Sequence, residues 1–216
     1  MSIAVQTGRI FLWLSVTTLA LWGFIDVTRD FLEGDTNEVD HAIMLVVAKI
    51  RVPWLTAIAV DVTALGSITL VTLFAALMFV VLLALRNRIG ALQLAIASIG
   101  AAFWTEVTKN IIERARPEVI PRLVEVSGSS YPSGHSLAAT STYFTIAILV
   151  GHRLESAPAR IAILAMAGLM IVLVAFSRVY LGVHYPTDVA GGVALGGAWA
   201  FFVAGTFSLI GHRRDR

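Results

Sequence analysis

Apolar stretches free of Asp, Glu, Lys and Arg alternate with polar links along the whole chain. A helix needs about 20 apolar residues to cross the hydrocarbon core of a membrane, and its backbone groups must be hydrogen-bonded within the segment. The pattern therefore predicts an all-α integral membrane protein with six transmembrane helices in one domain, residues 1–216. The predicted spans are residues 10–25, 62–85, 89–105, 135–151, 161–177 and 189–211.

The composition agrees with this pattern and excludes several classes of function that depend on cysteine or on nucleic-acid binding. Of the 216 residues, 57% are hydrophobic and 14% are charged, whereas soluble proteins average about 25% charged residues. The chain has no cysteine, which excludes disulfides, thiolate metal sites and cysteine nucleophiles. The net charge of +2 comes without a dense basic stripe, so no nucleic-acid partner is expected. Nothing in the sequence indicates an oligomeric state.

An even number of spans places both termini on one side of the membrane, together with links 86–88 and 152–160. Links 26–61, 106–135 and 178–188 then share the opposite side. The membrane itself thus separates the links into two groups, before any motif is considered.

The orientation follows from the basic residues of the short links. Arg86 and Arg88 share one link, and further arginines lie at the C-terminus, namely Arg213, Arg214 and Arg216. Short cytoplasmic loops carry an excess of Lys and Arg. We therefore expect the termini in the cytoplasm, the chain in the inner (plasma) membrane, and the other links on the extracytoplasmic side.

The first apolar stretch and the link after it leave alternatives open. Residues 10–25 could be a cleaved signal peptide, but no small-x-small cleavage site follows before Asp26, so a retained span is expected. Residues 26–53 form an extracytoplasmic link that is acidic and irregular as far as Asp40. Its apolar run, 43–48, is too short to span, which predicts an interfacial helix. A lid over a lipid entrance is the alternative.

Three polar stretches on the predicted extracytoplasmic side carry candidate chemistry. The first runs from Lys109 to Arg116-Pro117 and brings cations to the end of the third span. Lys and Arg also anchor spans at the membrane interface. This stretch alone is therefore compatible both with phosphate binding and with anchoring at the interface.

The second stretch, Pro132-Ser133-Gly134-His135, opens the fourth span. Glycine lets the backbone approach a ligand closely. The free N–H groups and positive dipole end of a first helical turn favour a bound phosphate. Ser133 can cap the helix or donate to a phosphate oxygen, and an ordinary helix start explains the motif equally well.

The third stretch holds Ser177-Arg178, His184 and Asp188, before the sixth span. Asp188 follows His184 by four residues, so the two share a face if the helix begins nearby. A carboxylate on one ring nitrogen fixes the tautomer and leaves the other nitrogen to react. A helix-capping Asp beside an incidental His is the alternative. The coincidence of two histidines and three cations on one membrane face exceeds what anchoring requires.

Taken together, the stretches resemble the three-part signature of the type 2 phosphatidic acid phosphatase family. The matching patterns are Lys109-x6-Arg116-Pro117, Pro132-Ser133-Gly134-His135 and Ser177-Arg178-x5-His184-x3-Asp188. Every signature position is filled, in order, over residues 109–188. The six-span layout extends the resemblance to most of the chain, least clearly over residues 26–53.

The resemblance implies roles for the catalytic residues. His184 would attack phosphorus and form a phosphohistidine, and Asp188 would orient His184. His135 would protonate the leaving alkoxide and then activate water for the second step.

The resemblance also implies a phosphate site without a cofactor. Lys109, Arg116 and Arg178 would hold the phosphate oxygens, assisted by Ser133 and the Gly134 amide. Phosphoryl transfer needs mainly positioning and charge stabilisation, and fixed cations can supply both. No carboxylate cage for Mg²⁺ is apparent in the sequence. We therefore expect neither a metal nor another cofactor.

The expected substrate is a membrane lipid phosphate, because spans and short links leave no room for a soluble substrate domain. Family members act on phosphatidate, phosphatidylglycerol phosphate, undecaprenyl pyrophosphate or lipid A phosphates, and the sequence does not choose among them. Two alternatives stay open. One is a phosphatase of a small soluble phosphate ester, and the other is a non-catalytic transporter or lipid-binding scaffold.

Overall fold

The computed structural model describes residues 3–211, and this part of the chain is folded into eight α-helices without a strand. The predicted all-α fold class is therefore confirmed for the described residues. The helices are α1 (Ile3–Glu33), α2 (Asn37–Lys49), α3 (Pro53–Ala64), α4 (Ile68–Ala84), α5 (Arg88–Ile111), α6 (Gly134–Gly151), α7 (Ala157–Tyr180) and α8 (Pro186–Gly211).

Several of these helices are long and apolar enough to cross a membrane. α1, α5, α7 and α8 meet both conditions, and the pair α3–α4, bent by 48°, would make a fifth span. α6, the fourth predicted span, is not among them. Its 18 residues include a histidine and several serines and threonines, which lower its apolarity. The count of six spans is thus not established by length and composition.

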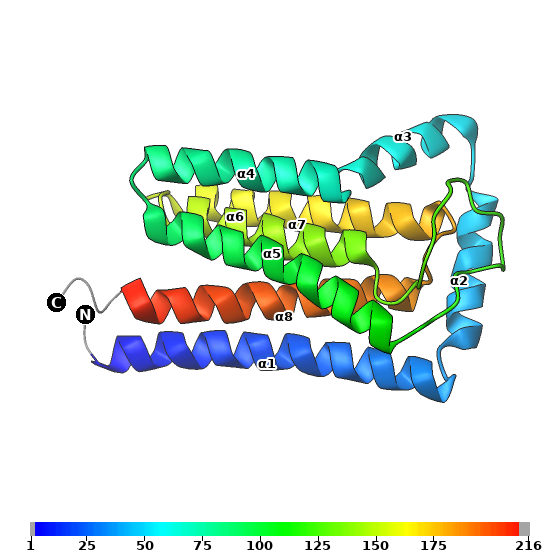
Figure 1. Ribbon diagram of the computed structural model, residues 1–216, viewed down its shortest axis with the longest axis horizontal. Helices are drawn as coiled ribbons and strands as arrows, with labels where there is room; N and C mark the ends of the chain where they lie inside the picture. The colour runs from blue at the N-terminus through cyan, green and yellow to red at the C-terminus, as the bar shows by residue number, and fades with distance from the viewer. Residues whose placement is uncertain (1–2, 212–216) are drawn as a thin grey trace.

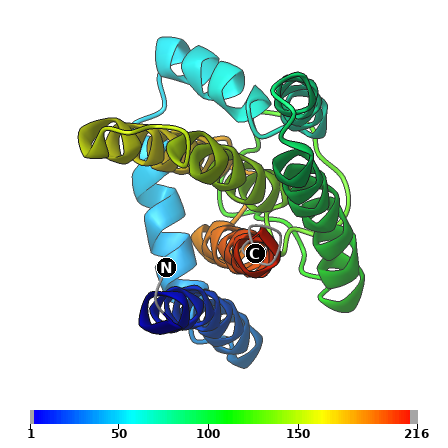
Figure 2. The same cartoon turned by 90° about the vertical axis from the view of Figure 1, so that its left-hand side faces the viewer.

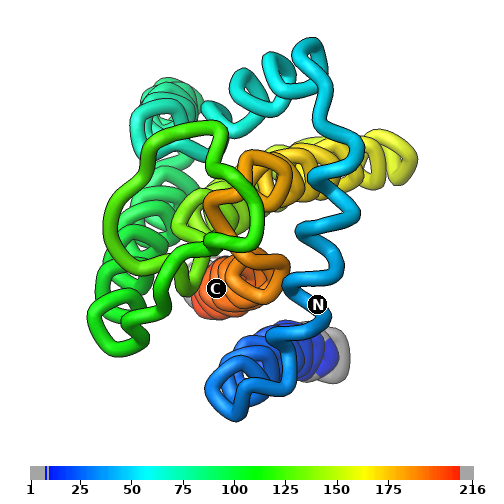
Figure 3. The backbone as a smooth tube through the Cα atoms, turned by 90° about the vertical axis from the view of Figure 1, so that its right-hand side faces the viewer, coloured from blue at the N-terminus to red at the C-terminus, as the bar shows by residue number. Residues whose placement is uncertain are grey.

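The long helices form a bundle whose two ends differ in character (Figure 1). α8 packs against α1, α5 and α6, and α6 also packs against α5 and α7. Viewed along the bundle, α8 lies between α1 and α6 (Figure 2). The start of α1 and the end of α8 share one end with the α4–α5 and α6–α7 connections. α2 and the 112–133 loop cover the other end (Figure 3). This is the grouping of links that was predicted.

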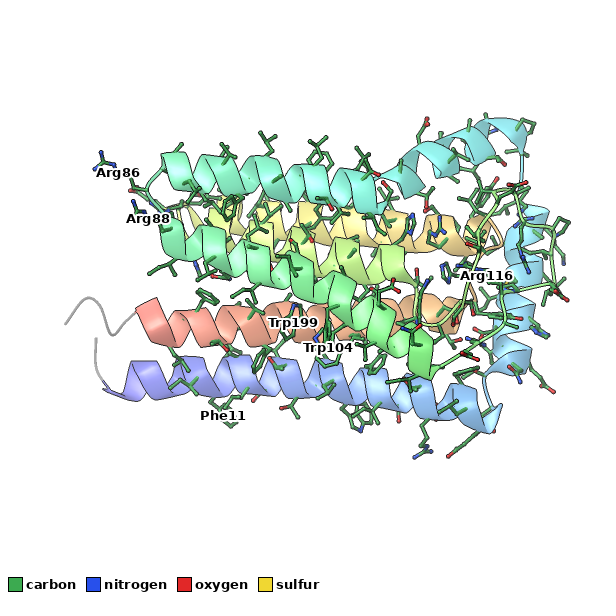
Figure 4. All side chains as sticks on the ribbon, viewed as in Figure 1. Phe11, Arg86, Arg88, Trp104, Arg116 and Trp199 are labelled. Atoms are coloured by element: carbon green, nitrogen blue, oxygen red, sulfur yellow. The ribbon has the colours of Figure 1, made fainter. Side chains whose placement is uncertain are left out.

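The outer surface of the bundle is apolar, as a lipid environment requires. Phe11 on α1 is 72% exposed, and Leu77 on α4 and Leu169 on α7 are similarly open. Charged side chains instead lie towards the ends, with Arg86 and Arg88 at one end and Arg116 at the other (Figure 4).

Several helices extend beyond the predicted spans, and the predicted irregular structure of residues 26–40 is wrong. α1 continues through Asp26 to Glu33, and Arg29 lies 3.3 Å from the Glu33 carboxylate one turn later. A charged residue ends a hydrocarbon span but not a helix, because the helical hydrogen bonds continue outside the lipid. For the same reason α5 includes Lys109 and α7 includes Arg178.

The apolar run that was predicted to form an interfacial helix lies in α2, which is longer than that run. α2 buries Asp40, Met44 and Val47, spaced as one helical face, and exposes Val39 and Ile43 on another. The helix crosses the end of the bundle rather than running along it (Figure 3). It contacts α7 and α8, so it lies beside the two segments that hold the third polar stretch.

The second predicted span, residues 62–85, is not one straight helix, because the chain bends between α3 and α4. Ser67 caps α4, accepting a hydrogen bond from the Leu70 N–H at 3.3 Å. The bend contains Gly66, where an added Cβ would collide with Val174 and come within 3.1 Å of the His135 Cβ. The bend thus brings the start of α4 against the start of α6.

Glycines let α6 and α8 approach closely. A Cβ on Gly192 would lie 2.6 Å from the Ser133 carbonyl oxygen, and one on Gly196 would lie 2.6 Å from the Leu137 carbonyl oxygen. Both carbonyls belong to backbone that cannot move aside cheaply. Helix contacts of this kind depend on small residues that let two backbones meet.

Substituting Gly196 with Val should separate α6 from α8 and destabilise the fold by about 1–3 kcal/mol, the usual cost of overpacking. The measurement is thermal unfolding of the purified protein in detergent. Gly168→Val is the matched control, since a Cβ at Gly168 on α7 meets nothing within 4 Å. Equal unfolding temperatures for the two variants would contradict the packing role.

Candidate active site

The three predicted stretches meet in one cavity of about 640 Å³ at the end of the bundle opposite the start of α1 and the end of α8. They arrive from different segments, namely α5, the 112–133 loop, α6, and the end of α7 with the connection to α8. The cavity is lined by six of the predicted residues, Lys109, Arg116, Gly134, His135, Arg178 and His184. Ser133 and Asp188 are fully buried; Ser133 precedes Gly134, and Asp188 follows His184 by four residues.

His184 lies in the connection between α7 and α8, with its two ring nitrogens in different surroundings. Nδ1 lies 3.4 Å from Oδ2 of Asp188, while Nε2 lies 3.5 Å from Nη1 of Arg116. The contact between Nδ1 and Oδ2 is longer than an ordinary hydrogen bond, so we regard it as a weak contact that favours one orientation of the ring. Nε2 is therefore the nitrogen that lies beside a cation.

The His184 ring is 2% exposed, and this burial lowers its pKa to about 4, against the opposing effect of Asp188. A lowered pKa means that the ring is neutral at neutral pH. One ring nitrogen then keeps its lone pair. With a proton held on Nδ1 towards Asp188, that nitrogen is Nε2.

Asp188 is fixed by the start of α8. The helix begins at Pro186, so Asp188 lies in its first turn, where a carboxylate is favoured by the helix dipole. Its Oδ2 accepts the Tyr185 N–H at 2.8 Å, and its Oδ1 accepts a hydrogen bond from Arg114 at 2.6 Å. Both oxygens are therefore held, and the one nearer to His184 cannot rotate away.

Arg178 is positioned by the last turn of α7 and is 4% exposed. Its Nη1 donates to Oγ1 of Thr63 at 2.7 Å. Its buried Nε has no hydrogen-bond partner among the described residues. A buried donor without a partner costs free energy, and an anion in the cavity would supply the missing acceptor.

Arg116 has two tasks in this geometry. Its guanidinium donates to the carbonyl oxygens of Gly128 at 2.9 Å, Ser127 at 2.8 Å and Val183 at 2.9 Å. These bonds fold the 112–133 loop over the connection that carries His184. Burial lowers the pKa of Arg116, while Asp188 raises it. Only its Nη1 edge faces Nε2 of His184, so much of the predicted phosphate-binding capacity of Arg116 is occupied by backbone carbonyls.

The start of α6 presents backbone rather than hydroxyl groups to the cavity. Ser133 is the N-cap, and its Oγ accepts hydrogen bonds from the N–H and the hydroxyl of Ser136 at 3.4 and 3.0 Å. Gly134 lines the cavity, and a Cβ there would lie 3.0 Å from Thr105. The first-turn N–H groups beside Gly134 form the kind of site that binds phosphate.

The cavity continues from the charged cluster into an apolar groove. Side chains of α4, including Val71, Ala75 and Phe79, form one wall, and side chains of α5, including Ala95 and Ile99, form the other. Lys109 and Glu106 lie on α5 between the groove and the loop. One space therefore joins polar groups suited to a phosphate with walls suited to hydrocarbon.

A buried ionic network behind His184 was not predicted from the sequence. Arg114 donates from Nη1 to Asp188 at 2.6 Å and from Nη2 to Asp40 at 2.8 Å. Asp40 is fully buried. One signal could have found it, because Asp40 occupies the same helical face as Met44 and Val47. A charge on the apolar face of a helix indicates a buried partner.

Among residues 3–211, no group of three or more His, Asp or Glu side chains is arranged to hold a metal ion. The charges that face the cavity are mainly those of Lys109, Arg116 and Arg178. Around a bound anion, these side chains would be the local source of positive charge.

Comparison with known proteins agrees with the geometry. Residues 90–210 match the PAP2 superfamily. The chain is 36% identical over 189 residues to phosphatidylglycerophosphatase B of Bacillus subtilis, covering 84% of this chain and 91% of the relative. It is also 34% identical to an undecaprenyl-diphosphatase of Sulfolobus acidocaldarius, over 55% of each chain.

The fold is shared with a solved structure. A crystal structure of a transmembrane PAP2-type phosphatidylglycerolphosphate phosphatase from Bacillus subtilis superposes with a TM-score of 0.85 at 30% identity. The superposition covers 90% of this chain and 97% of that structure. Family match, sequence identity and fold agree over most of the chain, which therefore belongs to the PAP2 superfamily.

Proposed function

We propose that this protein is a membrane lipid phosphatase that hydrolyses a phosphomonoester or pyrophosphate of a membrane lipid through a phosphohistidine intermediate. The observation that carries the proposal is the single cavity that joins the charged cluster around His184 to the apolar groove between α4 and α5. A phosphate with a hydrocarbon tail matches both parts at once. A small soluble phosphate ester would leave the groove empty.

In the first step, Nε2 of His184 attacks phosphorus and the bond from phosphorus to the lipid oxygen breaks. His135 donates a proton to that oxygen as it leaves. Asp188 holds the proton on Nδ1 and stabilises the positive charge that the ring gains. The neutral ring of His184, which follows from its lowered pKa, is the form that can attack.

In the second step, His135 takes a proton from water, the water oxygen bonds to phosphorus, and the bond from phosphorus to Nε2 of His184 breaks. Inorganic phosphate leaves. In both steps the non-bridging oxygens are balanced by Lys109, Arg178 and the free edge of Arg116, with N–H groups at Gly134. Fixed donors of this kind stabilise charge without a metal ion.

The proposed arrangement in the membrane has six spans in a single domain. The bent pair α3–α4 makes one span. α6 makes another, because its hydroxyl groups are satisfied inside the bundle, as with Ser141 donating to the Ala97 carbonyl at 2.9 Å. α2 lies at the extracytoplasmic interface, where a lipid headgroup reaches the cavity. The termini lie in the cytoplasm, and the membrane is the inner (plasma) membrane.

The substrate class is supported by the named relatives, which are a phosphatidylglycerophosphatase and an undecaprenyl-diphosphatase. We therefore propose phosphatidylglycerol phosphate, phosphatidate and undecaprenyl pyrophosphate as the lipids to test. A non-catalytic transporter or scaffold would need no nucleophile held by a carboxylate, and His184 with Asp188 supplies one.

His184→Gln should lower phosphate release by at least about 10³-fold, because the nucleophile is removed. The measurement is phosphate release from the three lipids by purified protein in detergent with EDTA, where wild-type activity should persist. His152→Gln, at the opposite end of the bundle after α6, is the control and should retain activity. Release by folded His184→Gln at the wild-type rate would contradict the mechanism, and loss of wild-type release in EDTA would contradict metal independence.

Single cysteines test the membrane orientation, because the chain has none of its own. Glu125 in the 112–133 loop and Glu155 between α6 and α7 are both exposed and lie in connections at opposite ends of the bundle. In right-side-out membrane vesicles, an impermeant maleimide should label Glu125→Cys, and should label Glu155→Cys only after detergent is added. The reverse pattern would place the cavity on the cytoplasmic side.

A further inference from the structure

We infer that Asp40 of α2 and Arg114 of the 112–133 loop are positioning residues that hold the Asp188–His184 pair in its reactive geometry. The inference rests on the proposed function and adds to it two residues outside the three motif stretches. Neither residue lines the cavity that holds His184, so both would act through Asp188 rather than on the substrate.

The network is continuous from α2 to His184. Nη2 of Arg114 lies 2.8 Å from Oδ2 of Asp40, and its Nη1 lies 2.6 Å from Oδ1 of Asp188. The other oxygen of Asp188 faces Nδ1 of His184. Arg114 is 8% exposed and both carboxylates are fully buried, so solvent does not weaken these interactions.

Asp40 also fixes the start of α8 directly. Its Oδ1 accepts the Thr187 N–H at 3.0 Å, and its Oδ2 accepts the Thr187 hydroxyl at 2.5 Å. An N–H in the first turn of a helix has no partner within the helix. Asp40 supplies that partner from another helix, one residue before Asp188, and so ties the position of the catalytic carboxylate to α2.

The guanidinium of Arg114 contacts two aromatic rings. Its central carbon lies 4.1 Å from the ring centroid of Phe31 on α1 and 4.2 Å from that of Tyr185. Cation–π contacts of this kind are favourable and strengthen when water is excluded. Arg114 therefore has one position, in which its two N–H edges face the two carboxylates.

The charges of the network indicate why two carboxylates are present. A single buried Arg–Asp pair would neutralise Asp188 and leave little charge to act on His184. Asp40 shares the guanidinium, so the three charges sum to one negative charge beside the histidine. In the first chemical step the His184 ring becomes positive. A nearby negative charge in a water-excluded site stabilises that state.

A purely structural role is the alternative, because removing one partner of a buried ion pair is destabilising whatever the chemistry. The two roles differ in what Asp40→Asn should change. The amide oxygen can still accept the Thr187 N–H, whereas the negative charge is gone. A structural role predicts a less stable protein with a normal turnover number, and a positioning role predicts a slower folded enzyme.

The experiment compares Asp40→Asn with Glu38→Gln, which makes the same chemical change on an exposed residue of the same helix. Both proteins are assayed on the lipid that the wild type hydrolyses fastest, after the folded fraction is measured by size-exclusion chromatography and thermal unfolding. Asp40→Asn should lower kcat by about 10–100-fold and leave KM within about threefold of the wild type. Losses of this size follow when a residue that hydrogen-bonds to a metal ligand is removed from a metal site. Glu38→Gln should match the wild type.

A second readout does not depend on activity. In protein labelled with ¹⁵N-histidine, the ring signals of His184 are those that vanish in His184→Gln. Asp40→Asn should shift the Nδ1 signal of His184, and Glu38→Gln should not. If Asp40→Asn does not fold, Thr187→Val tests the same network, because it removes the hydroxyl that bonds to both Asp40 and Arg114. This variant should also shift the Nδ1 signal of His184.

Two outcomes would overturn the inference. One is a folded Asp40→Asn protein that keeps the wild-type kcat, including the case in which its activity falls only because KM rises. The other is an unchanged His184 signal in Asp40→Asn or, if only that variant folds, in Thr187→Val. A wild-type protein that releases no phosphate from any lipid would instead overturn the proposed function, and the His184 signal would still decide whether Asp40 positions the histidine.

Discussion

The close approach of α6 and α8 is the constraint on which the rest of the site depends. Gly192 and Gly196 remove the side chains that would hold the two helices apart. The Ser133 N–H then donates to the carbonyl oxygen of Asp188 at 2.9 Å. This backbone bond sets the starts of the two helices side by side. One start carries the first-turn N–H groups at Gly134, and the other carries the Asp188 carboxylate, 3.4 Å from Nδ1 of His184.

The remaining parts of the site are arranged around that junction. Arg178 reaches it from α7 and Arg116 from the 112–133 loop. Lys109 reaches it from the last turn of α5, beyond the apolar segment. Bringing several cations together is unfavourable by itself. Here the buried carboxylates of Asp40 and Asp188 offset this cost, and a bound phosphate would offset it further. The site is thus organised to be complete only with an anion bound.

The sequence predicted that the three motif stretches lie together, because a membrane leaves polar side chains few places except the ends of the bundle. It predicted helix ends poorly, since Asp26 and Glu106 end apolar stretches without ending helices. It did not predict the contact of Arg114 with Asp40. The two are 74 positions apart, and only the way α2 crosses the bundle end brings them together. The roles of the motif residues remain proposals.

A crystal structure of the protein with orthovanadate would show directly whether His184 is the nucleophile, because vanadate adopts the geometry of a phosphoryl group in transfer. We expect vanadium bonded to Nε2 of His184, with oxygens facing Lys109, Arg178 and the N–H of Gly134. We also expect the Asp188 carboxylate at hydrogen-bond distance from Nδ1. Vanadium bonded to another side chain, or held through a metal ion, would contradict the proposed nucleophile and the site built around it.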